Sequence, residues 1–202
     1  MCIIEEKREL IKYGEKLVHK GLVASSGGNI SFKRDNKIFI TPTGVSLDEI
    51  SFDNLSEIDF ESGKLINNIK PSKETNMHLS IYKRKNIKVI IHAHPFYTSV
   101  LASHKKIQSG KDIPYYSPGY AVKVGEVGLV NYFPPGSNKL AEAVDKALIN
   151  KNAVLLKNHG IVVAENNFRK AFNLIEDIEN NARKYLEYGE VINKLNKSLF
   201  EE

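Results

Sequence analysis

The sequence predicts a single domain of the α/β class that spans residues 1–202. Segments with the apolar spacing of helices alternate with short runs of β-branched residues, and this alternation favours the α/β class. No linker rich in proline, glycine or serine divides the chain, and 202 residues suit one domain with a full-sized core. The composition, with 42% hydrophobic and 26% charged residues, is ordinary for a globular protein.

The first half of the chain is expected to contain two helices and several short strands. Apolar residues recur at helical spacing over residues 3–20. A glycine-rich turn leads into a strand in ASSGGNISF, and a second strand, KIFITPTG, covers residues 37–44. Residues 55–66 predict a hairpin with ESGK as its turn. Residues 71–86 predict a helix with Ser72 as its N-cap.

The second half is expected to begin with a buried strand, VIIHAH, and a helix that opens at Pro95. An irregular segment rich in glycine, proline and tyrosine follows at residues 109–138. A helix is predicted over residues 139–150, and a strand over residues 153–164 that Asn-His-Gly interrupts. A long amphipathic helix with many charges is predicted from residue 168 to about residue 191.

Charge, hydropathy and cysteine content argue against several classes of function. The net charge of +5 is modest and no aromatic-basic motif accompanies it, so no nucleic-acid partner is expected. The chain contains no apolar run near the roughly 18 residues of a membrane span, so no membrane association is expected. The first residues lack a signal-peptide pattern, and the single cysteine, Cys2, excludes an internal disulfide framework. These features predict a cytoplasmic protein.

Two histidines close the buried strand VIIHAH. Side chains alternate along a strand, so His92 and His94 share one face while Ala93 points away. This pattern offers two imidazoles to one metal ion, although two hydrogen-bonded histidines would leave the same pattern. His159 lies in the polar interruption of a later buried strand and could supply a third imidazole. Three histidines with an open position are typical of a catalytic zinc site.

Glu74 is the acid that the pattern associates with these histidines. It opens a helix a short distance before the histidine strand, where it could be a metal ligand, a general base, or a residue that stabilises the first helical turn. His78 follows four residues later on the same helical face and could orient Glu74.

Three turns, SSGGN, TPTG and PSK, supply hydroxyl groups, glycine amides, an asparagine and a lysine. Each turn alone is ordinary, but together they could form an anion-binding nest for a phosphate group. The chain contains neither a Walker motif nor G-x-G-x-x-G, so nucleotide binding is not favoured.

The ordered motifs SSGGNIS, ITPTGV, PSKETNMH, HAHPFYTSVLA, PPGSNKLAEAV and LLKNHGIVVA resemble the class II aldolase/adducin-head family, especially its L-fuculose-1-phosphate aldolase subgroup. The resemblance covers roughly residues 5–185. It implies a three-layer α/β/α domain with a mainly antiparallel central sheet, assembled as a homotetramer. It also implies one Zn2+ per subunit, or another divalent metal, held by four residues of this chain: His92, His94, His159 and Glu74.

The resemblance further implies reversible cleavage of a ketose 1-phosphate, L-fuculose 1-phosphate or a similar sugar, to dihydroxyacetone phosphate and an aldehyde. Glu74 would move the proton on the dihydroxyacetone-phosphate carbon, and a tyrosine in DIPYYSPGYAVK would serve the sugar hydroxyl. The candidate tyrosines are Tyr115, Tyr116 and Tyr120. The implied phosphate-binding residues are Ser26, Asn29, Thr43, Gly44, Ser72 and Lys73, of which Lys73 replaces the second serine usual in the subgroup.

Several other functions are compatible with parts of this pattern. The same scaffold serves methylthioribulose-1-phosphate dehydratases, 5-deoxypentulose-1-phosphate aldolases and pentulose-phosphate epimerases, the last typically with Asp in place of Glu74. An unrelated zinc hydrolase or lyase fits the order of the ligands poorly. The retained histidines argue against a module that only oligomerises or binds through a basic surface.

Overall fold

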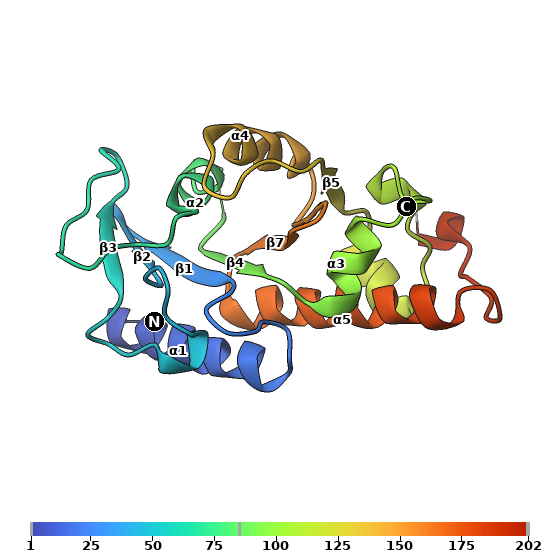
Figure 1. Ribbon diagram of the computed structural model, residues 1–202, viewed down its shortest axis with the longest axis horizontal. Helices are drawn as coiled ribbons and strands as arrows, with labels where there is room; N and C mark the ends of the chain where they lie inside the picture. Colours follow the sequence, from blue (N-terminus) through green and yellow to red (C-terminus); the bar gives the residue numbers. More distant parts are fainter. Residues whose placement is uncertain (1, 85, 201–202) are drawn as a thin grey trace.

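The computed structural model describes residues 2–84 and 86–200, and within these ranges the chain folds around one seven-stranded sheet (Figure 1). The strand order is β3-β2-β1-β4-β7-β6-β5. Among these neighbours only β5 and β6 run parallel, so the predicted mainly antiparallel sheet is confirmed. The strands are β1 (Asn29–Arg34), β2 (Lys37–Ile40), β3 (Ser56–Asp59), β4 (Val89–Ala93), β5 (Gly128–Val130), β6 (Ala153–Leu156) and β7 (Gly160–Glu165).

Helices cover both faces of the sheet, which confirms the three-layer α/β/α architecture (Figure 1). One face packs against α1 (Ile3–His19), α3 (Phe96–Ala102) and α5 (Phe168–Tyr188). The opposite face packs against α2 (Thr75–Ile81) and α4 (Asn138–Ala147). The two hydrophobic cores lie between these layers, because alternate residues of each strand point to opposite faces.

The helices form where the sequence combines an apolar stripe with a start signal. In α5 the buried positions include Phe168, Ala171, Phe172 and Ile175, the spacing of one helical face. The side chain of Asn167 caps the helix by accepting a hydrogen bond of 2.9 Å from the amide of Lys170. No helix in the described ranges is long and apolar enough to cross a membrane.

The structure differs from the sequence predictions in four elements. The strand predicted over 153–164 is a hairpin, because the chain reverses between β6 and β7. The second arm of the hairpin predicted over 55–66 forms only an isolated bridge. The helix predicted over 71–86 begins at Thr75, with Glu74 instead of Ser72 at its N-cap. The irregular segment 109–138 contributes the edge strand β5, whose short length hides it from periodicity.

Candidate metal centre and active site

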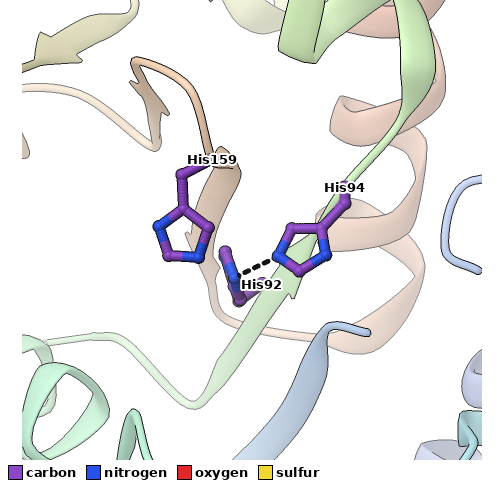
Figure 2. Close-up of side chains that lie close together, drawn as sticks. All are labelled: His92, His94 and His159. Carbon is purple, nitrogen blue, oxygen red and sulfur yellow. Dashed lines mark hydrogen bonds between the residues drawn. The ribbon is translucent and has the colours of Figure 1, made fainter. Parts of the chain in front are cut away.

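His92 and His94 project from the end of β4, at the centre of the sheet. His92 is fully buried, and its Nδ1–H donates to the carbonyl oxygen of Ile161 at 2.9 Å. This bond to the neighbouring strand β7 fixes the imidazole and turns Nε2 toward His94 and Glu74. His94 Nε2 lies 2.8 Å from His92 Nε2 (Figure 2), so the two rings face one point as the alternation of strand side chains predicts.

His159 reaches the same point from the turn between β6 and β7. Its ring centroid lies 4.8 Å from that of His92 and 5.3 Å from that of His94. One nitrogen of each of the three rings lies within 4.8 Å of the others, and Figure 2 shows the three side chains converging. The antiparallel pairing of β4 with β7 brings these residues together although they are far apart in sequence.

Glycines allow the two loops beside the histidines to approach closely. A Cβ at Gly160 would clash with the carbonyl oxygen of Ala93 and lie 2.7 Å from Cδ2 of His94. A Cβ at Gly27, in the predicted glycine-rich turn, would lie 2.9 Å from Nδ1 of His94. These positions have no room for a side chain, which explains why glycine flanks the imidazoles.

Glu74 places its carboxylate against the same point and is only 5% exposed. Its Oε2 lies 3.0 Å from Nε2 of His92, and its Oε1 lies 3.6 Å from Nε2 of His159. Oε1 is buried and has no hydrogen-bond partner among the residues that the structure describes. A buried oxygen of this kind indicates a group that is kept for binding or chemistry.

The electrostatic environment keeps Glu74 ionised and the imidazoles of His94 and His159 neutral. Burial alone would raise the pKa of Glu74. Attraction to His92 and His159, together with hydrogen bonds from His92 and Asn29, outweighs burial and holds the pKa of Glu74 well below its usual range. Burial and repulsion from the neighbouring imidazoles lower the pKa of His94 to about 3 and that of His159 to about 4. Neutral imidazoles and an ionised carboxylate are the forms that bind metal.

The donor set fits a divalent metal ion. Three imidazole nitrogens and one carboxylate oxygen around one point form a ligand set suited to zinc. The bond from His92 Nδ1 to a backbone carbonyl is the support that metal-binding histidines usually have.

Asn29 has two partners inside the site. Its Nδ2 donates to Oε2 of Glu74 at 3.1 Å, and its Oδ1 lies 2.6 Å from Nε2 of His78. The His78 ring contacts Asn29, and Asn29 contacts the carboxylate of Glu74. The predicted role of His78 in orienting Glu74 would therefore act through Asn29. Asn29 Nδ2 keeps a second N–H, so its predicted phosphate contact stays a prediction.

The other predicted phosphate-binding residues lie on three loops: Ser26 lies before β1, Thr43 and Gly44 lie after β2, and Ser72 and Lys73 lie before α2. The loops that follow β2 and precede α2 are joined by backbone hydrogen bonds of 3.2 Å from Ser72 to Thr41 and from Thr43 to Lys70. Ser72 is buried and its Oγ accepts from the amide of Glu74, whereas Ser26, Gly44 and Lys73 are exposed.

The candidate tyrosines lie in another part of the chain's fold. The backbone amide of Tyr116 donates to Asn181 on α5, and the ring of Tyr120 is 1% exposed in the core on the α5 face. The carbonyl oxygen of Tyr115 accepts from Leu195 near the end of the described chain. The structure gathers these tyrosines around α5 and the C-terminal segment, and it gathers the histidines and Glu74 at the end of β4.

The fold and the convergent donors define a metal-dependent enzyme with a three-histidine centre. The chain belongs to the class II aldolase and adducin N-terminal domain family, whose model matches residues 8–186. This membership makes it a sugar-phosphate enzyme of that superfamily.

Similar proteins differ in the reaction that they perform. A 3-oxo-tetronate 4-phosphate decarboxylase from Haemophilus influenzae is 33% identical over 92% of this chain and 89% of its own length. An L-fuculose phosphate aldolase from Methanocaldococcus jannaschii is 35% identical over 88% of this chain and 94% of its own. The solved structure of YgbL from Klebsiella pneumoniae, described as a candidate aldolase/epimerase/decarboxylase, superposes with a TM-score of 0.92 at 30% identity and covers 100% of both chains.

Proposed function

We propose that this enzyme cleaves a carbon–carbon bond beside the ketone carbonyl of a phosphorylated substrate and releases dihydroxyacetone phosphate. The observation that carries the proposal is the buried Oε1 of Glu74, which lies beside three convergent imidazoles and has no hydrogen-bond partner in residues 2–84 and 86–200. A ketose 1-phosphate, L-fuculose 1-phosphate or a similar sugar, is the first candidate substrate. The relative that is an L-fuculose phosphate aldolase supports this candidate.

His92, His94, His159 and Glu74 would hold one divalent ion, with Zn2+ as the expected ion. When bound, the metal polarises the substrate carbonyl and stabilises the negative charge that bond cleavage leaves on its oxygen. Glu74 delivers or removes the proton at the carbon that loses its neighbour, because its Oε1 is the unpaired acceptor at this point.

The phosphate group would bind the loops next to Glu74. Gly44, at φ 79°, turns the TPTG loop, and Ser72 and Lys73 precede Glu74. Backbone amides, hydroxyls and one lysine are suitable donors for a phosphate, and the net charge of +5 favours an anionic substrate. Binding at this remote group would fix the position of the ketone.

Decarboxylation of 3-oxo-tetronate 4-phosphate is a second candidate. The similarity to a 3-oxo-tetronate 4-phosphate decarboxylase supports it. Aldol cleavage requires a base for the hydroxyl proton of the departing aldehyde, and Tyr115, Tyr116 and Tyr120 are gathered around α5 and the C-terminal segment. In decarboxylation the carboxylate leaves as CO2, and only the carbon beside the ketone takes up a proton. Both reactions then end with the same protonation, which Glu74 would perform.

A substrate comparison tests the proposal. Zinc-loaded protein is incubated separately with L-fuculose 1-phosphate and with 3-oxo-tetronate 4-phosphate, and dihydroxyacetone phosphate is measured. We expect release from one of them, with lactaldehyde in the first case and CO2 in the second. Release from neither, together with failure to exchange the α-proton of dihydroxyacetone phosphate in deuterated water, would reject the proposed function.

We further expect the enzyme to act as a homotetramer. Phe96 and Val100 on α3 are 68% and 41% exposed, and they follow His94 closely in the chain. Another copy would cover such apolar side chains. Measurement of the mass in solution tests this expectation.

A further inference from the structure

A continuous row of buried polar side chains leads away from Glu74 between β1 and α2. Asn29 Nδ2 donates to Glu74 at 3.1 Å, and Asn29 Oδ1 lies 2.6 Å from Nε2 of His78. His78 Nδ1 lies 2.7 Å from Oγ of Ser31, which lies 2.7 Å from the hydroxyl of Tyr82. We call these five residues the polar ladder. Each is at most 5% exposed, so water does not substitute for their mutual contacts.

The ladder forms because two regular elements match in spacing. Glu74, His78 and Tyr82 are four residues apart on one face of α2 and its flanks, while Asn29 and Ser31 are two apart on one face of β1. Four residues advance a helix by about 6 Å, and two residues advance a strand by about 6.6 Å. The side chains of the two elements therefore interleave, which fixes the position of α2 along β1.

The donors of the ladder all point toward Glu74. An ionised carboxylate only accepts, so Asn29 turns its amide nitrogen to Glu74 and its oxygen to His78. His78 must then donate from Nε2, and burial, partly offset by attraction to Glu74, lowers its pKa to about 3, which keeps the ring neutral.

The remaining hydrogens follow from that tautomer. The unprotonated Nδ1 of His78 accepts from the hydroxyl of Ser31, because this nitrogen has no hydrogen to give. Ser31 has a single hydrogen, so its oxygen accepts from Tyr82, whose hydroxyl also lies 3.4 Å from the carbonyl oxygen of Lys88. Hydrogen bonds aligned in one direction reinforce one another in a buried environment.

We propose that His78 is a positioning residue, which fixes Asn29 and through it the carboxylate of Glu74. The role in proton transfer rests on the proposed function. Without the donor from His78, the oxygen of Asn29 loses its buried partner, so the amide is no longer held in place and can move away from the carboxylate. The carboxylate of Glu74 would then be less well positioned for the proton transfer. The three histidines would still converge, because His92 keeps its hydrogen bond to the carbonyl oxygen of Ile161.

Three variants separate this role from general stability. His78→Leu removes both polar ends, His78→Gln keeps one donor and one acceptor, and Ile81→Ala shortens a buried apolar residue of α2 outside the ladder. The readout is the rate at which dihydroxyacetone phosphate exchanges its α-proton with deuterated water, together with bound zinc and KM. We expect His78→Leu to keep zinc and KM but to exchange at least about tenfold more slowly. His78→Gln and Ile81→Ala should stay within about threefold of the wild type, because only His78→Leu breaks the ladder.

A wild-type exchange rate in His78→Leu, or a His78→Gln variant as slow as His78→Leu, would overturn the proposal. If His78→Leu does not fold, Ser31→Ala takes its place, since it removes only the hydroxyl that holds the far side of the His78 ring at Nδ1. Ser31→Ala should also slow the exchange, and an unchanged rate would overturn the proposal.

A measurement on the unaltered protein tests the direction of the ladder independently of activity. Nitrogen-15 NMR of labelled histidines, assigned with His78→Gln, should show His78 neutral and protonated at Nε2. A charged ring or protonation at Nδ1 would overturn the proposal. Absence of exchange in the wild type would reject the proposed function instead, and the tautomer would still decide whether the ladder has the inferred direction.

Discussion

The two carboxylate oxygens of Glu74 have different surroundings. Its Oε2 accepts a hydrogen bond from Asn29 and faces His92, while its Oε1 is buried without a hydrogen-bond partner in the described part of the chain. Leaving a buried polar atom unpaired costs about 1–3 kcal/mol, so a residue with only a structural role would be poorly placed here. The arrangement suits a group that binds a metal and then exchanges a proton.

Replacement of Glu74 by glutamine separates these two roles. Glu74→Gln keeps the shape of the side chain but removes its charge and its capacity to take a proton. We expect the variant to retain zinc on three histidines and to lose turnover by about 10²–10⁴-fold. Exchange of the α-proton of dihydroxyacetone phosphate should be lost to the same extent. Wild-type exchange with zinc bound would show that Glu74 is not the base.

Removal of one imidazole should affect metal content first. His94→Ala takes away one of three convergent nitrogens, and two imidazoles with a carboxylate hold zinc less tightly. We expect the purified variant to contain much less zinc than the wild type by elemental analysis. His19→Ala, at an exposed position of α1, is the control and should keep the wild-type content. Equal zinc in both variants would count against the proposed ligands.

At the scale of elements, the β6–β7 hairpin and the end of β4 form one unit. The turn carries His159, β7 supplies the carbonyl that accepts from His92, and Gly160 lies directly against Ala93 and His94. The position of His159 therefore depends on how closely β7 can approach β4.

Gly160→Ala tests this dependence. The added Cβ would clash with the carbonyl oxygen of Ala93, so the hairpin must shift. We expect a loss of about 1–3 kcal/mol in the free energy of unfolding and weaker zinc binding. Gly119→Ala is the matched control, because its nearest neighbouring atom would lie 3.8 Å away and its backbone is helical. Denaturation and zinc titration of both variants give the comparison, and equal behaviour would refute the close-approach argument.

Local sequence patterns predict the helices and strands better than they predict where the chain reverses its direction. The i, i+2 spacing placed His92 and His94 correctly on one side, because strand alternation is local. The apolar runs on both sides of Asn158 predict one strand over 153–164 that Asn-His-Gly interrupts. In the structure Asn158 adopts φ 57° at this interruption and the chain reverses there, so the two runs pair as an antiparallel hairpin.

At the scale of the whole molecule, the polar ladder joins residues that are distant in sequence. Its side-chain contacts connect positions 45 to 51 residues apart, and no periodicity reports such pairings. The sequence did carry a partial signal, namely Glu74, His78 and Tyr82 at helical spacing and Asn29 and Ser31 at strand spacing. Only the packing of α2 on β1 shows that the two sets interleave.

The buried His78 also makes stability depend on pH. Burial, partly offset by attraction to Glu74, lowers its pKa from 6.5 to about 3 in the folded protein. The unfolded chain therefore binds a proton below about pH 6.5 that the folded chain does not bind, and stability falls as the pH falls through that window. Above about pH 7 the contribution of His78 is constant. Each further pH unit below about 6.5 costs about 1.4 kcal/mol until the folded pKa is reached.

His78→Gln isolates this contribution in metal-free protein. Urea denaturation at about pH 7.5 and pH 5.5 gives the loss of unfolding free energy for the wild type and for the variant. We expect the wild type to lose about 1.4 kcal/mol more than His78→Gln over this interval, because glutamine takes up no proton in either state. The other histidines contribute equally to both proteins and cancel in the difference. An equal loss would mean that His78 takes up its proton over the same pH range in the folded and the unfolded protein, which contradicts both its burial and its hydrogen-bond partners.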